Sequence, residues 1–458
     1  MNDYLDVGVV RIQQWLTRTP WLRGRRGAST MLTTATGAGA VEKVLDAHAP
    51  GLAEPNPEVG DVDGVVSLRL HDPEPRSVEQ TEQAVVKHLR AALPAASFKV
   101  SRWSGESYVD AMRDGSPLFE HEWPAAVAEW PPGRPCQWCE TWPAHAVVNE
   151  RTREGNKDLA MCADCIERQE PNNAGYNTSP QHLPGPEREL IRRALERGLP
   201  PKLPDEFQEL ATMDGIRETH IAAVQADGNA IGDVISKIRT TRTNAERALP
   251  AAINEATWEA LLDAVGCIWK PDDARRLPII PHLVGGDDVL VSVPARRGWA
   301  FSRAFQECFN DRISEAIADM PKGVPPISVS VGLVFHHRTT PFFVFTELSE
   351  TLLKRAKSEH QGKIPALAWQ EITRDGANPT ARPSMPLTTL DKFWSSLRNL
   401  ADLQQSTRQR LATLLHNEGN SETLDEHLGR LGLTATAAPF RAGGGIDLRN
   451  ALDMVRWW

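Results

Sequence analysis

The sequence Gly285-Gly286-Asp287-Asp288 interrupts an apolar, β-branched stretch that continues on both sides of it. Residues 283–284 (Leu-Val) precede it, and residues 289–293 (Val-Leu-Val-Ser-Val) follow it. This pattern predicts a tight hairpin between two buried strands, with two carboxylates at its tip. The glycines Gly285 and Gly286 leave room for a nucleoside triphosphate to approach the backbone. The alternative interpretation is an ordinary glycine-rich turn whose aspartates are only hydrated.

The length and charge of the chain limit the possible functions. A chain of 458 residues is too long for one ordinary core and suggests two to four domains. The formal charge of -9 argues against a chain that coats nucleic acid non-specifically. The first residues lack a basic region followed by an apolar core, and no run is long enough to cross a bilayer. We therefore expect a cytoplasmic protein that does not bind a membrane.

Residues 11–30 carry arginines and no acidic residue, namely Arg11, Arg18, Arg23, Arg25 and Arg26. This composition favours a phosphate-facing surface, although a soluble helix and loop would show the same pattern.

The first part of the chain predicts an α+β sandwich. We expect strands at residues 4–10, 65–70 and 98–103, and a helix at residues 77–92. A further helix follows the first strand and leads through a basic turn into residues 27–29. A proline-rich loop at residues 171–186 precedes a helix that begins near residue 187.

After residue 219, the order of elements predicts a ferredoxin-like palm with one extra helix and one extra strand. We expect strands at residues 220–226, 327–335 and 365–372, together with the hairpin at 285–288. We expect helices from about residue 230 and at residues 258–269, 299–317 and 346–360. Pro278 and Pro281 make the first hairpin strand short or irregular. From residue 387 only helical periodicity remains, so the predicted domains are 1–128, 129–215, 216–383 and 384–458.

Four cysteines have the spacing of a metal site. Cys136 and Cys139 form one pair, and Cys162 and Cys165 form the other, with 22 residues between the pairs. Four thiolates can close a tetrahedral shell around zinc and leave no position for substrate. The pattern therefore predicts a structural zinc site, and unrelated buried thiols are the alternative.

A third aspartate belongs with the hairpin pair. Asp227 ends the strand at 220–226, and Gly228 lets the chain turn directly afterwards. The first strand of a ferredoxin-like sheet lies beside the hairpin, so Asp227 can face Asp287 and Asp288. Magnesium or manganese would stabilise three such carboxylates and would also take up phosphate. The alternative role for Asp227 is a helix N-cap.

Basic residues cluster near the end of the last palm helix: Lys354, Arg355, Lys357 and Lys363. Lys354 and Lys357 could hold triphosphate oxygens near the metals, and a hydrated helix terminus is the alternative. His71 and Asp72 spell a nuclease-type dipeptide, but the companion histidines of such a site are missing. We therefore expect no nuclease chemistry at these two residues.

The order of these features resembles the large polymerase/cyclase subunit of type III CRISPR effector complexes. The matching segments are YLDVGVVRIQQWLTRTPWLRGRRGASTML, the four-cysteine segment, AVQADGNAIGD, LVGGDDVLVSVP, SVSVGLVFHHRTTPF and ELSETLLKRAKSEHQGK. The resemblance implies two palm domains with a zinc module between them and a helical domain after them. It also implies that other effector subunits, guide RNA and target RNA are partners.

The resemblance further implies a reaction at the second palm. Asp227, Asp287 and Asp288 would bind catalytic metal, with Gly285 and Gly286 forming the nucleotide-facing turn. ATP would be joined 3′ to 5′ into cyclic oligoadenylate, a second messenger made when the complex holds target RNA. Ser29 falls where the partner palm contributes to the paired ATP pocket.

The sequence departs from the family pattern in two places. The first palm strand begins at residue 4, so we expect no N-terminal nuclease domain and no DNA cleavage. Asn229 stands where the family often has another acidic residue, so we expect weakened or retuned metal binding. Two rivals remain open: a catalytically weak scaffold that binds guide RNA and small subunits, and a free-standing cyclic nucleotide synthase.

Overall fold

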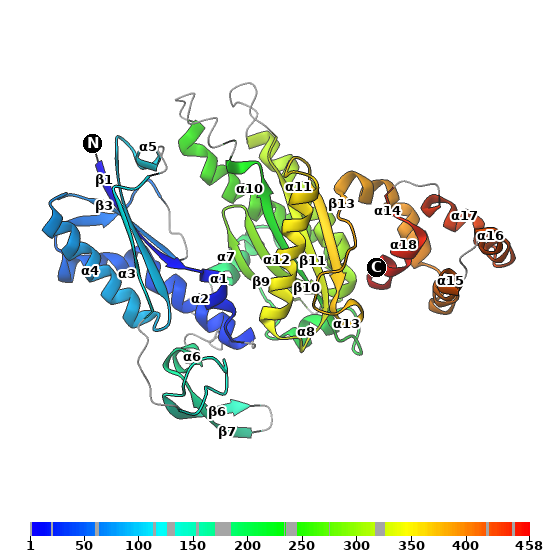
Figure 1. Ribbon diagram of the computed structural model, residues 1–458, viewed down its shortest axis with the longest axis horizontal. Helices are drawn as coiled ribbons and strands as arrows, with labels where there is room; N and C mark the ends of the chain where they lie inside the picture. Colours follow the sequence, from blue (N-terminus) through cyan, green and yellow to red (C-terminus); the bar gives the residue numbers. More distant parts are fainter. Residues whose placement is uncertain are drawn as a thin grey trace. The chain divides into compact units, whose positions relative to one another are not determined.

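The computed structural model describes residues 2–19, 22–59, 64–112, 116–125, 133–152, 155–169, 185–232, 234, 245–273, 275–316, 326–417, 421–441 and 445–458. The chain divides into two compact units, the first made mainly of residues 1–193 and the second mainly of residues 194–458. Figure 1 shows one large β-sheet in each unit.

The first unit contains a five-stranded antiparallel sheet in the order β2-β3-β1-β4-β5. The strands are β1 (Asn2–Val10), β2 (Ala53–Pro55), β3 (Val65–Leu70), β4 (Ser97–Gly105) and β5 (Phe119–Trp123). The first strand in sequence lies at the centre, between the third and the fourth. The order β4-β1-β3-β2 is that of a ferredoxin-like unit, which confirms the predicted fold class for this half.

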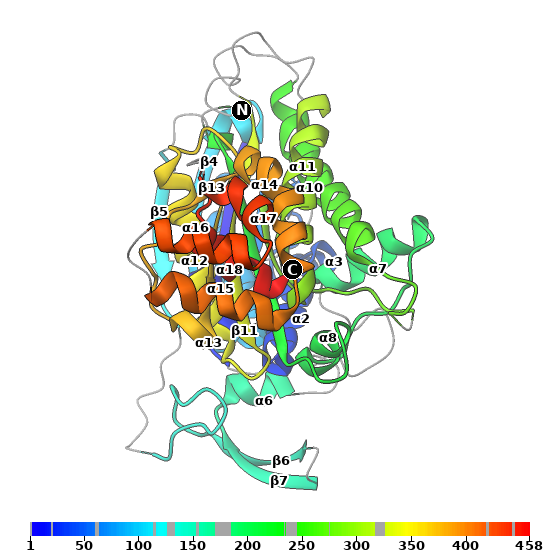
Figure 2. The same cartoon turned by 90° about the vertical axis from the view of Figure 1, so that its right-hand side faces the viewer.

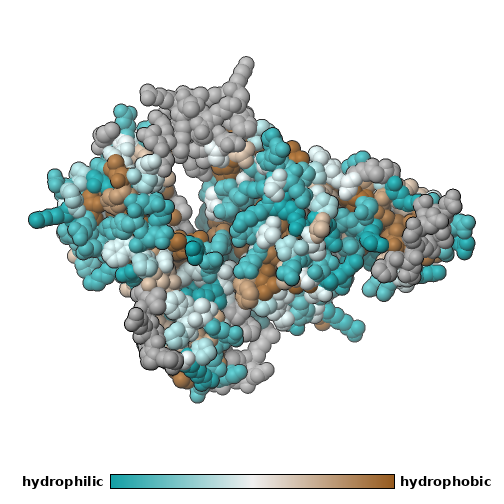
Figure 3. Space-filling model, in the orientation of Figure 1, coloured by the Kyte–Doolittle hydropathy of each residue, from teal (hydrophilic) through white to brown (hydrophobic). Residues whose placement is uncertain are grey.

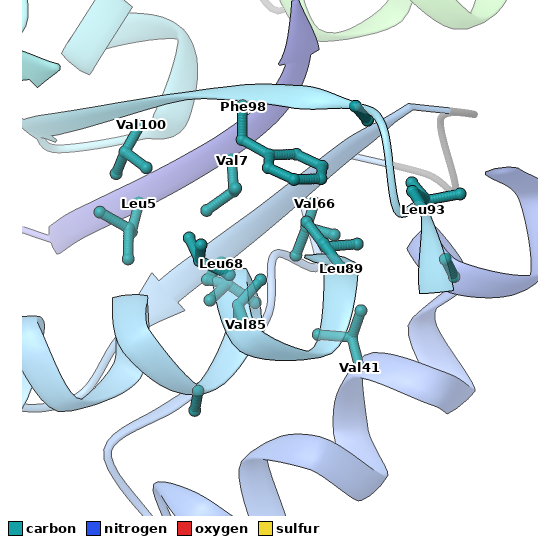
Figure 4. Close-up of a cluster of buried hydrophobic side chains, with 14 of the residues drawn as sticks. Leu5, Val7, Val41, Val66, Leu68, Val85, Leu89, Leu93, Phe98 and Val100 are labelled. Atoms are coloured by element: carbon teal, nitrogen blue, oxygen red, sulfur yellow. The ribbon is translucent and has the colours of Figure 1, made fainter. Parts of the chain in front are cut away.

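Helices close the core of this sheet. They are α1 (Ile12–Thr17), α2 (Leu22–Thr36), α3 (Ala38–His48), α4 (Pro75–Ala92) and α5 (Tyr108–Met112). Figure 4 shows Val85 and Leu89 of α4 and Val41 of α3 facing the apolar side chains of the strands. Alternate residues of β1, such as Leu5 and Val7, are fully buried, as expected for a sheet that packs one face on helices.

The basic segment of the first unit forms a helix, so the predicted turn into residues 27–29 is wrong. Residues 23–29 lie inside α2 because Gly27 packs against the backbone of Arg168, where a Cβ atom would approach the carbonyl carbon to 3.0 Å. Such tertiary packing overrides weak local propensity. Arg18 pairs with Asp164, Arg26 lies 2.6 Å from Glu187, and Arg25 is buried. A phosphate-facing surface is therefore the wrong interpretation for Arg18, Arg25 and Arg26, and it stays a prediction for Arg11 and Arg23.

The cysteine segment forms a small module in the same unit. It contains the hairpin of β6 (Ala146–Thr152) and β7 (Gly155–Met161), followed by α6 (Ala163–Gln169), which lie together in Figure 2. A longer helix, α7 (Gly185–Glu196), begins two residues before the predicted position. Most of the predicted loop at 171–186 lies outside the described residues.

The second unit contains a six-stranded sheet in the order β13-β12-β11-β8-β10-β9. The strands are β8 (His220–Asn229), β9 (Ile280–Gly285), β10 (Asp288–Pro294), β11 (Ser328–His337), β12 (Ala366–Glu371) and β13 (Met385–Pro386). The order β11-β8-β10-β9 repeats the ferredoxin-like arrangement of the first unit, and β12 and β13 extend it. The predicted irregularity of β9 is confirmed, because the register shifts where Pro281 lies opposite Val291.

Helices lie on both faces of this sheet. They include α8 (Phe207–Thr212), α10 (Ala245–Ile268), α11 (Gly298–Ala316), α12 (Phe342–Glu359) and α13 (Ile372–Asp375), and the short turn η2 (Ala295–Arg297) precedes α11. Leu333 contacts the start of α11 at Gly298, whereas the neighbouring Gly332 lies under Ser349 of α12. Burial on both faces explains why β11 is a continuous apolar run. The helix predicted from residue 230 falls largely outside the described residues.

The C-terminal part is helical, as predicted. It contains α14 (Leu387–Ala401), α15 (Gln405–Asn417), α16 (Ser421–Arg430), α17 (Thr434–Ala437), η3 (Ala438–Phe440), α18 (Leu448–Met454) and η4 (Val455–Trp457). The indole N–H of Trp457 donates to the Glu371 carboxylate at 3.0 Å, and Trp299 donates to the Met454 carbonyl at 3.1 Å. These contacts dock the chain end on the second sheet.

Hydrophilic side chains predominate on the face drawn in Figure 3, and hydrophobic ones form separate patches. None of the helices in the described part of the chain is long and apolar enough to cross a membrane.

Candidate functional site: a carboxylate cluster and a cysteine cluster

The three predicted aspartates lie at one end of two neighbouring strands. Ala226 of β8 pairs with Val289 of the antiparallel β10, so Asp227, which follows Ala226, and Asp288, which precedes Val289, lie at the same end of the two strands. Asp287 belongs to the turn between β9 and β10. The side chains of Asp227 and Asp287 are within hydrogen-bonding range, and Asp288 is close enough to interact with both through its charge. The sheet therefore brings together residues that are distant in sequence.

The hairpin turn consists of Gly286 and Asp287, because Gly285 pairs with Asp288. Gly286 has a φ of 61°, which suits the first central position of a type II′ turn and favours glycine. Space above Gly285 is open, since a Cβ atom there would meet nothing within 4 Å. The turn thus leaves its backbone accessible to a ligand, as the sequence predicted.

The predicted turn at Gly228 is wrong, because β8 continues through Gly228, which pairs with Val329 and lies close to Asp287 of the hairpin. Its N–H donates to the Asp287 carboxylate at 3.1 Å. A Cβ atom at residue 228 would lie 2.8 Å from the same carboxylate oxygen and would also collide with Ile231. Residue 228 therefore positions Asp287 through its backbone, and a side chain there would displace the Asp287 carboxylate.

Two carboxylates of the cluster, those of Asp287 and Asp288, have raised pKa values. Partial burial is the largest cause that raises the pKa of Asp287 to about 6, and the neighbouring Asp227 adds to it. Asp288 is exposed at the start of β10, yet the protein around its carboxylate limits its hydration. This effect and the charges of Asp227 and Asp287 raise the pKa of Asp288 to about 7. Such mutual repulsion is what a divalent cation would relieve.

The two predicted lysines differ in their surroundings. Lys357 of α12 forms an ion pair with Asp227 and donates to the Gly228 carbonyl at 2.7 Å. Lys354 is 73% exposed and pairs with Glu350, one turn away, at 2.6 Å. Lys357 therefore contacts the carboxylate cluster directly, whereas Lys354 lies at its margin.

Asn229 is a structural residue. It is 1% exposed, and its amide nitrogen donates to the Ser328 hydroxyl at 2.9 Å and to the Ile364 carbonyl at 3.2 Å. Its amide oxygen accepts from the Ser330 hydroxyl at 3.1 Å. Both ends of the amide are thus committed to neighbouring backbone and strand β11.

Ser29, the predicted contribution of the first domain, lies in the middle of α2 and not at the start of a helix. It is buried, and its carbonyl accepts from the Thr33 hydroxyl at 3.0 Å. A role for Ser29 in nucleotide binding stays a prediction.

The four predicted cysteines form a compact cluster. Among the described residues they are the group of metal-binding side chains whose ligand atoms all lie within 4.8 Å of one another. The sulfurs of Cys139 and Cys162 are 3.9 Å apart. Sulfurs bound to tetrahedral zinc at about 2.3 Å would be about 3.8 Å apart, so the cluster fits zinc. The three aspartates are less compact, and cation binding would require their side chains to draw together.

Charged residues that the sequence analysis did not identify fasten the cysteine cluster to the first domain. Asp164 lies between Cys162 and Cys165 and pairs with Arg168 at 2.6 Å. Arg168 is fully buried and donates to the Trp15 carbonyl at 2.8 Å. The cluster therefore holds the start of the first domain in place. Spacing gave no signal for this link to the first domain, because Trp15 and Arg168 are about 150 positions apart.

The remaining nuclease-like dipeptide has ordinary partners. His71 lies 3.6 Å from Glu54, and Asp72 accepts from the Ser77 hydroxyl at 2.5 Å. The absence of nuclease chemistry at His71 and Asp72 stays a prediction.

Comparison with known proteins identifies the second domain. Residues 220–364 match the model of the Cas10/Cmr2 second palm domain. A search of the curated proteins finds no match to this sequence. The predicted resemblance to the large subunit of type III CRISPR effector complexes is confirmed, and the family match itself covers the palm domain.

Solved structures match the chain along its whole length. A Csm1-Csm4 cassette in complex with cA4 has a TM-score of 0.56 at 12% identity, covering 100% of this chain and 69% of the other. The cassette in complex with AMPPNP has a TM-score of 0.54 at 12% identity, with the same coverage. Csm1 in T.onnurineus has a TM-score of 0.52 at 13% identity, also covering 100% and 69%. The similarity establishes the fold: two palm domains, a cysteine module between them in sequence, and C-terminal helices.

Proposed function

We propose that the second domain is a metal-dependent nucleotidyltransferase that converts ATP into cyclic oligoadenylate. The observation that carries this proposal is the meeting of Asp227, Asp287 and Asp288 at the accessible end of a palm sheet. The cassette structures of similar fold, in complex with cA4 and with AMPPNP, support the same kind of ligand here. Asp227 and the hairpin aspartates would hold magnesium or manganese, which supplies charge stabilisation to the reacting phosphate.

The residues of this chain would act by positioning and by charge. A ribose 3′-hydroxyl forms a bond to the α-phosphorus of a second ATP, and the bond from that phosphorus to the β-phosphate oxygen breaks. The hydroxyl proton passes to solvent, and pyrophosphate leaves. Lys357 would exchange its contact with Asp227 for a triphosphate oxygen, which holds the leaving group in line. Gly285 and Gly286 would let the nucleotide lie against the turn.

The biological setting is part of the same proposal. The chain would belong to a cytoplasmic type III CRISPR effector complex with other subunits, guide RNA and target RNA, and target RNA would switch on synthesis. The Csm1-Csm4 cassettes support association with further subunits. The cysteine cluster would hold structural zinc, which requires thiolates that stay reduced.

A scaffold role is the second candidate, and one observation favours it. Asp227, Asp287 and Asp288 do not form a compact ligand set as the four cysteines do. In this case the second domain would bind RNA and subunits without forming product.

The test is to incubate the purified protein with labelled ATP and manganese, with and without guide and target RNA. We expect cyclic oligoadenylate from the wild type and none from the D287A/D288A double variant, whose circular dichroism and zinc content should be unchanged. Equal product from the double variant would overturn the enzymatic proposal. Absence of product from the wild type in the presence of RNA would favour the scaffold, and product without RNA would favour a free-standing synthase.

A further inference from the structure

The hairpin turn that carries Asp287 also contacts a buried hydroxyl group, that of Thr257, through the Gly286 carbonyl. Thr257 lies on α10 and is fully buried. Its hydroxyl is 2.7 Å from the Gly286 carbonyl and 2.9 Å from the Ile253 carbonyl in the preceding helical turn. A tip residue of a hairpin normally has its carbonyl in water, so this contact with a helix distant in sequence calls for an explanation.

The contact fixes the orientation of one peptide plane. The Gly286 carbonyl and the Asp287 N–H belong to the same planar peptide, which is the central peptide of the two-residue turn. A flip of this plane would convert a type II′ turn into a type I′ turn, with a positive φ at Asp287. In the structure Gly286 has a positive φ, and Asp287 is not among the residues with positive φ. A hydrogen bond to the Gly286 carbonyl thus selects one of two available turn forms.

The selected form places the Asp287 carboxylate against Gly228. With the carbonyl held toward α10, the Asp287 N–H faces its own carboxylate, and the Gly228 N–H reaches the same group at 3.1 Å. The peptide flip would bring a carbonyl oxygen toward the carboxylate in place of an N–H. Thr257 and Gly228 therefore hold the turn at two points, the Gly286 carbonyl and the Asp287 carboxylate, and favour one position of Asp287.

We propose that Thr257 is a positioning residue, which holds the Gly286–Asp287 peptide in the orientation that presents Asp287 to a divalent cation. This inference rests on the proposed function, because it takes the hairpin aspartates to be cation ligands. Thr257 does not itself contact the cation or the nucleotide. A hydroxyl is needed at this position, and the methyl group of threonine is not.

The test compares Mn²⁺ binding by three zinc-loaded proteins, measured by calorimetry without nucleotide. We expect Thr257→Val, which keeps the shape and removes the hydroxyl, to bind Mn²⁺ about tenfold more weakly than the wild type. Thr257→Ser should restore binding to within about twofold of the wild type. Hydrogen exchange of the amides at residues 286–288 should accelerate in the valine variant and not in the serine variant.

The matched control is Thr81→Val in α4 of the first unit. Thr81 is also fully buried and also bonds to a carbonyl one helical turn back, that of Ser77, at 2.8 Å. Thr81→Val therefore shows the effect of losing only a hydroxyl bond within a helix. The Mn²⁺ affinity of this variant should equal that of the wild type. If Thr257→Val fails to fold, Thr257→Ala removes the same hydroxyl with a better helix former.

The outcomes separate this inference from the proposed function. Equal Mn²⁺ affinity of the wild type and a folded Thr257→Val or Thr257→Ala variant would overturn the inference, as would failure of serine to restore a lost affinity. Absence of Mn²⁺ binding by the wild type would overturn it too. Mn²⁺ binding that depends on Thr257, without any product from ATP and RNA, would support the inference and count against the proposed nucleotidyltransferase.

Discussion

The four ferredoxin-like strands have the same order in both sheets of this protein, but the residues at the same edge differ in chemistry. In the first sheet Gly8 of β1 pairs with Val65 of β3, and in the second Ala226 of β8 pairs with Val289 of β10. In the first sheet, the next residues beyond this pair are Val9, which follows Gly8, and Gly64, which precedes Val65. The Val9 N–H donates to the Gly64 carbonyl at 2.8 Å. The corresponding positions of the second sheet are Asp227 and Asp288.

This difference shows what the palm topology supplies and what the side chains supply. The topology brings the central strand and the hairpin to a common edge in both domains, whatever residues stand there. The proposed cation site needs carboxylates at that edge and a glycine that lets them approach, and Lys357 offsets part of their charge in the metal-free protein. The proposed function therefore depends on a few side chains added to a repeated scaffold.

The largest expected effect tests the dependence of the first domain on its metal site. Cys162→Ser together with Cys165→Ser should remove zinc, because two of four ligands are lost. Asp164 and Arg168 would then no longer be held, and hydrogen exchange should increase by at least about a hundredfold in residues 12–36 and 133–169. Mn²⁺ binding by the second domain should remain. Exposed Cys267 offers the control, since Cys267→Ser should change neither property.

Unaltered protection of residues 12–36 in the zinc-free double variant would show that the first domain does not rely on the cysteine cluster.

The second prediction concerns the close approach that only the second sheet requires. In Gly228→Ala the new methyl group would displace Asp287, whose carboxylate oxygen lies 2.8 Å from the position of the Cβ atom. We expect product formation to fall by about a hundredfold, as misplacement of a reacting group by about 1 Å can cause. Gly232→Ala is the matched control, because its Cβ atom would meet nothing within 4 Å. Comparable rates for both variants would show that the position of Asp287 is not critical.

The third prediction uses the raised pKa values of the hairpin aspartates. At pH 5 the pKa values of about 6 for Asp287 and about 7 for Asp288 leave both groups protonated in the metal-free protein. Mn²⁺ must then displace these protons, so the affinity for Mn²⁺ should increase as the pH rises from 5 to 7. The increase should be up to about tenfold per pH unit for each proton displaced, and the affinity should level off above pH 7. Calorimetry from pH 5 to 8 measures the slope. A flat profile would mean that these carboxylates do not bind the cation.

The sequence predicted the elements that follow from local patterns. The strand at residues 65–70 has the predicted bounds, the hairpin lies at the predicted glycines, and the four cysteines meet, because alternation, turn chemistry and ligand spacing are short-range signals. The prediction of two palm domains came from the family resemblance and not from these local patterns alone.

Features that depend on distant partners were missed or wrongly interpreted. Arg18, at the end of α1, and Arg26 of α2 are paired within the protein, since Asp164 and Glu187 approach them only in the folded chain. Asn229 is occupied by Ser328 and Ser330, about 100 residues away. Thr257 has no motif at all, because its partner is a backbone carbonyl of a remote turn.

The smallest expected effect separates the two lysines that the sequence analysis treated alike. Lys357→Ala should raise the KM for ATP by about tenfold, because this ammonium group is the one that reaches the carboxylate cluster. It should not weaken Mn²⁺ binding, since it also removes a cation that competes for Asp227. Lys354→Ala should change the KM by less than about twofold, as expected for an exposed lysine in a surface ion pair. Steady-state kinetics of both variants, with Mn²⁺ binding measured separately, distinguish a lysine that binds triphosphate from one that only shields the aspartates. An unchanged KM for Lys357→Ala would assign it the shielding role, and the second sheet would then differ from the first by its carboxylates and their counter-charge alone.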